Sequence, residues 1–158
     1  MNDLDRAGQI LDRLRTTLEV ELVQARGQRV MVRTLDTQGL FERARQRGAF
    51  NVQLAQLERS LAEALEAAGH ALGLKQVTLV DLRLAVPEAA QRLDGLLDEV
   101  RSLAGALRET DALNQRLGDR ALRRLRGHLS AVTPRTVAYD RRGALSPIAA
   151  LSTARRVA

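Results

Sequence analysis

Side chains able to do chemistry are few and widely spaced in this chain of 158 residues. It has no cysteine, which excludes disulfides, thiolate nucleophiles and cysteine-ligated metals. The two histidines, His70 and His128, are 58 positions apart and share no carboxylate cluster, so we expect solvated side chains rather than metal ligands. No glycine-rich phosphate loop, nucleophile elbow or HExxH pattern is present. The residues predict no catalytic centre, cofactor or metal site, and they favour a protein that acts by binding.

The basic residues gather at the C-terminal end. The chain has a net charge of +6, yet residues 116–158 carry ten arginines against Asp119 and Asp140, so residues 1–115 are slightly acidic. Such asymmetry is typical of a surface that contacts nucleic acid, a membrane or an acidic protein. The arginines that lie adjacent or one helical turn apart are Arg116, Arg120, Arg123 and Arg124. They form either a solvated helix face or a phosphate-binding one, and the lack of aromatic residues among them disfavours single-stranded nucleic acid.

The composition is that of an all-α protein. Aromatic residues make up only 2% of the chain, which disfavours a β-sandwich or barrel, and the commonest residues are good helix formers. No run of 18 apolar residues is present, and the N-terminus lacks the apolar segment of a secretory signal. We therefore expect a cytoplasmic protein without a membrane span.

Apolar residues at helical spacing divide the chain into long helices. One amphipathic pattern runs from about residue 3 to about residue 35, and Asp36–Gly39 supplies turn chemistry that predicts a break or a kink. A second helix starts near residue 40 and ends at Leu72, with Gly73 as its cap; we expect its Arg43–Gly48 segment to be exposed.

A short connector and a third long helix complete the predicted architecture. Thr78–Asp81 resembles a capping box and opens a short helix through about Ala85. Pro87 suits the first turn of the last helix, which should end by Thr133 because Pro134 follows. The predicted fold is an elongated antiparallel bundle or hairpin of about three long helices, a short connector helix and a flexible C-terminal tail.

The last 26 residues differ from the rest. Large apolar side chains are sparse there, and prolines and a glycine interrupt any long element. We therefore predict two domains, a helical bundle at 1–132 and a flexible tail at 133–158 that folds on binding. Ser146 and Pro147 suit the start of a helix that would place Ile148 and Leu151 on one face.

Two residues stand out against their surroundings. Asn114 interrupts the apolar face of the last helix, and the favoured interpretation is a buried amide that fixes the register between helices, with a partner contact as the alternative. Tyr139 is a lone aromatic in a weakly apolar tail, where an anchor at an interface is the better explanation.

Two short segments carry a resemblance to a known family. Leu113-Asn114-Gln115-Arg116-Leu117 resembles the asparagine-containing segment of the FlgN-type flagellar export chaperones, and Tyr139-Asp140-Arg141-Arg142-Gly143 resembles their Tyr-Asp-x-x-Gly element. The order of helices is also similar over nearly the whole chain. In this sequence Asp111 and Gln115 replace an Asn and a Gly that the family segment often carries.

The resemblance implies a cytoplasmic chaperone without enzymatic activity. Such proteins bind the terminal helices of hook–filament junction proteins, prevent their premature assembly and deliver them to the flagellar type III export gate. The implied partners are these cargo proteins and the export gate, with export ATPase components as further candidates. The candidate partner-binding residues are Asn114, Leu117, Leu125, Tyr139, Asp140, Gly143, Ile148 and Leu151.

Two other functions remain open. An Arg-rich helical protein that binds nucleic acid would show steep salt dependence, whereas cargo binding predicts a shallow salt response and a negative heat-capacity change. A purely structural coiled-coil protein, dimerising through exposed seams, is the third possibility.

Overall fold

The computed structural model describes residues 3–74, 77–132, 137–139 and 145–147. Its elements are α1 (Asp3–Thr34), α2 (Thr37–Ala71), α3 (Leu79–Ala85), α4 (Pro87–Val132), β1 (Val137–Tyr139) and β2 (Leu145–Pro147). The chain forms two compact units, Met1–Asp119 and Arg120–Ala158. The candidate residues Asp140, Gly143, Ile148 and Leu151 lie outside the described residues.

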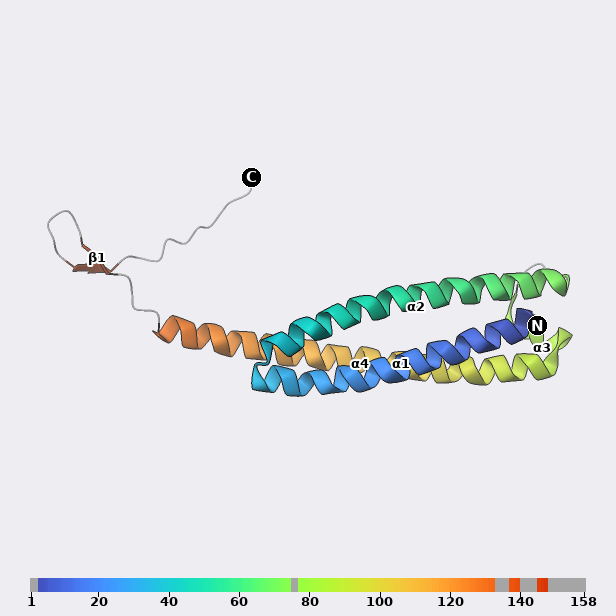
Figure 1. Ribbon diagram of the computed structural model, residues 1–158, viewed down its shortest axis with the longest axis horizontal. Coiled ribbons are helices and arrows are strands. Elements are labelled where there is room, and N and C mark those ends of the chain that lie inside the picture. Colours follow the sequence, from blue (N-terminus) through green and yellow to red (C-terminus); the bar gives the residue numbers. More distant parts are fainter. Residues whose placement is uncertain (1–2, 75–76, 133–136, 140–144, 148–158) are drawn as a thin grey trace. The chain divides into compact units, whose positions relative to one another are not determined.

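The first unit is the predicted bundle of long helices. Figure 1 shows α1, α2 and the first part of α4 running side by side, with α3 at one end. The N-terminal half of α1 packs with the C-terminal half of α2 and the beginning of α4, so α2 is antiparallel to both. This arrangement confirms the predicted all-α bundle of long helices with a short connector.

The turn between α1 and α2 confirms the predicted break. Leu35 adopts a left-handed conformation with φ 54°, which ends α1. Asp36 caps α2, and its Oδ1 accepts a hydrogen bond of 2.9 Å from the backbone N–H of Gly39. A Cβ at position 39 would lie too close to this carboxylate, so a larger residue there would force the Asp36 side chain to shift.

The predicted signals at the other helix ends are also confirmed. Gly73 has φ +68°, and its N–H donates to His70 O while the N–H of Leu74 donates to Gly69 O, which is the Schellman pattern. The Thr78 hydroxyl caps α3 by accepting from the N–H of Asp81 at 3.1 Å. Pro87 is the first residue of α4, and Val132 is the last.

The core is built around α1, which contacts every other helix of the first unit through two clusters of buried residues. The larger cluster joins leucines and alanines of all four helices: Leu4, Ala7, Ile10, Leu11, Leu14, Ala64, Ala68, Leu82, Ala90 and Leu93. The smaller cluster comprises Leu18, Leu22, Ala25, Phe50 and Leu107. Small alanines at the helix contacts let the backbones approach closely, which suits a thin bundle with few aromatic residues.

The C-terminal segment contains a feature that the sequence did not predict. β1 and β2 pair antiparallel, with Val137 opposite Pro147, Ala138 opposite Ser146 and Tyr139 opposite Leu145. Ser146 and Pro147 therefore lie in a strand here, and the helix that we expect them to open on binding stays a prediction. The domain boundary at 132/133 also stays a prediction, since the two units meet within α4.

Candidate functional site

The C-terminal part of α4 presents a row of exposed leucines. Leu122, Leu125 and Leu129 have exposed fractions of 52%, 38% and 65%. Their spacing of three and four residues places them on one side of the helix, and we call this row the leucine face. By helical rotation it is the side that carries Leu107 and Asn114 further up α4, where both residues are buried. The same side of α4 is therefore buried at Leu107 and Asn114 and exposed at the three leucines of the leucine face.

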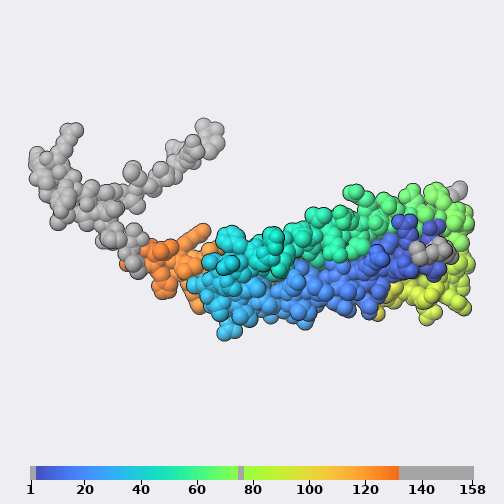
Figure 2. All heavy atoms as spheres, in the orientation of Figure 1, coloured from blue at the N-terminus to red at the C-terminus, as the bar shows by residue number. Residues whose placement is uncertain are grey.

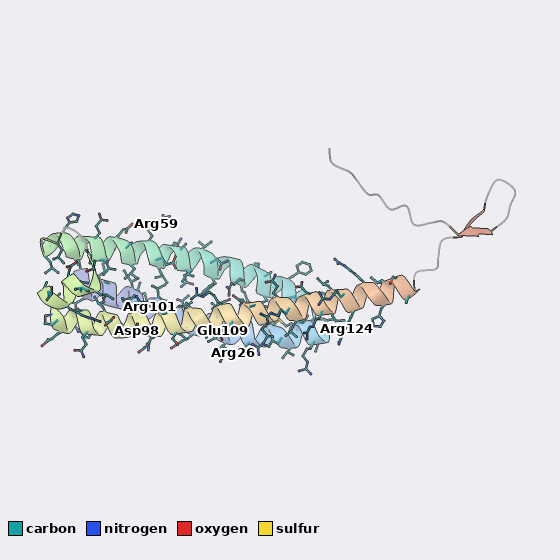
Figure 3. The ribbon with its side chains drawn as sticks, turned by 180° about the vertical axis from the view of Figure 1, so that it is seen from behind. Arg26, Arg59, Asp98, Arg101, Glu109 and Arg124 are labelled. Carbon is teal, nitrogen blue, oxygen red and sulfur yellow. The ribbon has the colours of Figure 1, made fainter. Side chains whose placement is uncertain are left out.

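The opposite side of the same segment is basic. The four arginines singled out by sequence, Arg116, Arg120, Arg123 and Arg124, are all exposed; Figure 3 labels Arg124 on this part of α4. Among the residues that the structure describes, none of the four forms an ion pair with a carboxylate, whereas Arg101 further up α4 is paired with Asp98 at 3.0 Å (Figure 3). The segment is therefore amphipathic, apolar on one side and cationic on the other.

Asn114 lies in the bundle and fixes two helices against each other. Its side chain is buried, and Nδ2 donates a hydrogen bond of 2.7 Å to the backbone carbonyl of Ala25 on α1. Sliding α4 by one turn would break this bond and bury the amide without a partner, which agrees with the favoured interpretation of a register-fixing residue. Its Oδ1 is buried without a hydrogen-bond partner. A role for Asn114 in partner binding is untested.

A buried ionic cluster lies one turn from this contact, and the sequence pattern did not predict it. Arg43 of α2 forms an ion pair with Glu21 of α1, and the exposed fractions of these side chains are only 5% and 3%. Arg47 bridges the same Glu21, at 2.5 Å, to Asp111 of α4 at 2.6 Å. The cluster thus ties all three long helices together. Arg47 also stacks on Phe50, with its guanidinium carbon 5.0 Å from the ring centre.

The expectation that Arg43–Gly48 is an exposed stretch is therefore wrong for Arg43. Arg45 is exposed as expected, but Arg43, Arg47 and Phe50 follow one another at helical spacing on the side that faces α1. That spacing continues to Leu54, and this apolar continuation was the sequence signal that Arg43 and Arg47 lie on the buried side of α2. The carboxylates that make burial of the arginines possible come from other helices, so the neighbouring sequence of α2 does not reveal them.

The remaining candidate residues divide by position. Leu117 is half-buried on α4, and Leu125 belongs to the leucine face. Tyr139 lies in β1. Leu122 was not among the predicted residues, although its place three residues before Leu125 on an apolar stripe was a usable signal. Its exposure could not be read from periodicity, because periodicity does not show where the covering helices end.

The structure gives no support for metal binding or membrane spanning in the part of the chain that it describes. The described residues contain no group of three or more His, Asp and Glu side chains placed to hold a metal ion. His70 is exposed, with its Nε2 3.9 Å from Glu66 Oε1 on the same helix. None of the helices, within the described ranges, is both long and apolar enough to cross a bilayer.

Comparison with known proteins gives a family. The family model described as FlgN protein matches residues 2–147, which includes all four helices and both strands. Comparison with curated proteins and with solved structures gives no match. The match extends over far more than half of the chain, and the helical bundle agrees with it. The chain belongs to the FlgN family and is a flagellar export chaperone.

Proposed function

We propose that this chaperone acts in the cytoplasm on hook–filament junction proteins. It binds their terminal helices, prevents premature assembly and delivers them to the flagellar type III export gate, without catalysing a reaction. The observation that carries the proposal is the leucine face of α4 in a chain that belongs to the FlgN family. An amphipathic helix is recognised by laying its apolar side against such a row of leucines spaced three and four residues apart.

The leucine face accounts for only part of the affinity. Its three side chains together expose the equivalent of about one and a half leucines, and covering them would contribute roughly 3 kcal/mol. Because every 1.4 kcal/mol is about tenfold in affinity, this burial corresponds to a factor of about 10². A usable complex therefore needs further contacts.

The C-terminal segment is proposed to supply them. Residues 133–158 act as a tail that folds on the partner, with Ile148 and Leu151 on one side of a short helix. Tyr139, Asp140 and Gly143 form the element that docks on cargo or on the export gate. Leu117 and Asn114 of α4 are proposed as further cargo contacts.

Titration against the C-terminal fragment of a hook–filament junction protein tests the leucine face. We expect Leu129→Ser to weaken binding by about tenfold, since a hydroxymethyl group replaces apolar area that the cargo covers. Leu84→Ser is the matched control, because Leu84 is 82% exposed but lies on α3 and is not part of this face. Equal affinities of wild type and Leu129→Ser, with unchanged far-UV circular dichroism, would contradict the proposal.

Two changes test the tail separately. Deleting residues 133–158 should leave the helical signal of the bundle largely intact while cargo binding is lost. Tyr139→Ala should weaken binding or delivery without changing the melting temperature. Cargo affinity that survives the deletion would exclude the tail from the site, and a large drop in melting temperature would show that Tyr139 stabilises the fold instead.

The cationic side of α4 supports a second candidate, binding of duplex nucleic acid. Four arginines that form no ion pair with the described residues could neutralise four phosphates, and binding would then fall about 10²-fold between roughly 50 and 200 mM salt. Titration against random duplex DNA at these two concentrations separates the candidates. DNA binding alone, lost as salt rises, would replace the chaperone proposal, whereas salt-resistant binding to the cargo fragment supports it.

A further inference from the structure

The solvent side of α1 changes character half-way along the helix. In its first half this side carries the polar residues Asp5, Asp12 and Thr16. In its second half it carries Val20, Val23 and Val30, which are 53%, 68% and 62% exposed, together with Gly27. Figure 2 shows α1, in blue, uncovered along this face of the first unit. We call residues 20, 23, 27 and 30 the valine stripe.

Nothing within the bundle explains this choice of residues. Valine loses side-chain freedom in a helix, and when the valine is exposed this entropy cost is not offset by burial of apolar area. Glycine in a helix interior costs about 1 kcal/mol relative to alanine. A Cβ added at Gly27 would meet no atom within 4 Å, so no intramolecular contact requires glycine there.

The spacing of the stripe is that of a coiled-coil seam. With Thr16 and Thr34 at its two ends, the exposed residues follow one another at four, three, four, three and four positions. This alternation is the a/d pattern of a heptad, in which β-branched residues pack well between two helices. The structure thus gives α1 two seams, one buried in the bundle and one open to solvent.

The pattern is also the same in both directions. About Ala25 as centre, position 20 mirrors position 30, 23 mirrors 27, and 16 mirrors 34. A two-fold interface brings the same patch of both copies together and therefore requires this self-complementarity. We propose that a second copy of this chain binds along the valine stripe with its α1 antiparallel. Val20 then packs against Val30 of the other copy, and Val23 fills the space above Gly27.

The charges beside the stripe favour this arrangement. Glu19 and Arg33 are exposed and lie on the same flank of it. They are 14 residues apart, about 21 Å along the axis, so they cannot pair within one helix or across a parallel pair. In the antiparallel pair, Glu19 of each copy lies near Arg33 of the other, which gives two ion pairs related by the two-fold axis.

The size of the patch sets the strength of the dimer. Residues 16–34 extend about 27 Å, and the contact of two such helices is small beside the interfaces of permanent dimers. We therefore expect reversible association in the micromolar range or weaker. The valine stripe and the leucine face share no residue, so the two proposals are tested with different variants.

Sedimentation equilibrium of the full chain, from about 10 µM to about 1 mM, tests the proposal. The average mass should rise with concentration from 17.4 kDa toward twice that value. Val23→Glu should weaken association at least about tenfold, because it places a charge inside the seam. Val52→Glu is the matched control, since Val52 is 60% exposed but lies on α2. A chain that stays monomeric throughout, or a dimer indifferent to Val23→Glu, would overturn the proposal.

A charge exchange tests the antiparallel geometry. Glu19→Arg and Arg33→Glu should each weaken the dimer, because each brings like charges together across the two-fold axis. The double variant should restore most of the association, with circular dichroism showing that α1 stays helical. Failure of the double variant to restore it would overturn the antiparallel arrangement.

Discussion

Loss of the Glu21 side chain should destabilise the bundle strongly. Its carboxylate accepts hydrogen bonds from Arg43 and Arg47, and its side chain is 3% exposed. In Glu21→Ala, Arg47 keeps Asp111 as partner and is half-buried, so water can reach it. Arg43 keeps only the Gln24 side-chain oxygen at 3.3 Å and stays buried, with a Nε that already has no partner.

The size of the effect follows from this isolation. A buried charge that loses its counter-ion costs about 3–5 kcal/mol, because its desolvation is no longer offset. With a urea dependence of about 2 kcal/mol per molar, a loss of about 4 kcal/mol lowers the unfolding midpoint by about 2 M. Replacing both partners, as Glu21→Leu with Arg43→Met, should recover most of that loss, since apolar residues of similar volume carry no desolvation penalty.

Urea unfolding followed by circular dichroism at the helical band measures these differences. Glu42→Ala is the comparison, because Glu42 forms an exposed ion pair with Arg45 on the same helix and solvent screens that pair. Its midpoint should stay close to that of wild type. A loss below about 1 kcal/mol in Glu21→Ala, or no recovery in the double variant, would show that the ionic cluster does not hold the three helices as described.

Further predictions concern a helix end and a surface pair. Gly73→Ala should destabilise the protein by about 1–2 kcal/mol, since φ is +68° there, whereas Gly95→Ala in open space on α4 should stabilise it by about 0.5–1 kcal/mol; equal effects in thermal unfolding would refute the cap. The hydrogen bond from Arg45 lowers the pKa of Glu42. The ionised form is therefore favoured in the fold, so the contribution of this pair is full above the usual glutamate pKa and is lost progressively as pH falls from there through the lowered pKa. Carboxyl-carbon NMR titration should show that Arg45→Ala raises this pKa; an unchanged value would refute the assignment.

The helix ends could be predicted from the sequence because their causes are local. The Asp36 cap, the Gly73 turn, the Thr78 cap and Pro87 each act within about four residues, so the sequence shows both partners. The burial of Arg43 could not be predicted in this way. Its counter-ion, Glu21, is 22 residues away on another helix. Without a visible counter-ion, an arginine is expected to be exposed to solvent.

The candidate site was predictable only in outline. Periodicity showed that α4 has one apolar side, but not that Leu107 is buried while Leu122 and Leu129 are exposed. That difference depends on which helices lie against each part of α4. The β1–β2 hairpin escaped prediction because strands of three residues are too short for an alternating pattern to be recognised.

The strand β1 holds the only tyrosine, and the chain has no tryptophan. All tyrosine fluorescence of the purified protein therefore arises from the C-terminal segment, while the only fluorescent side chains of the helical bundle are its two phenylalanines. Quenching and anisotropy of this signal would report on that segment directly, in the native chain and without a label. With no cysteine present, a single introduced thiol could carry an acceptor dye at a chosen helix. The sequence thus provides a natural donor for measuring distances from this segment as partners bind.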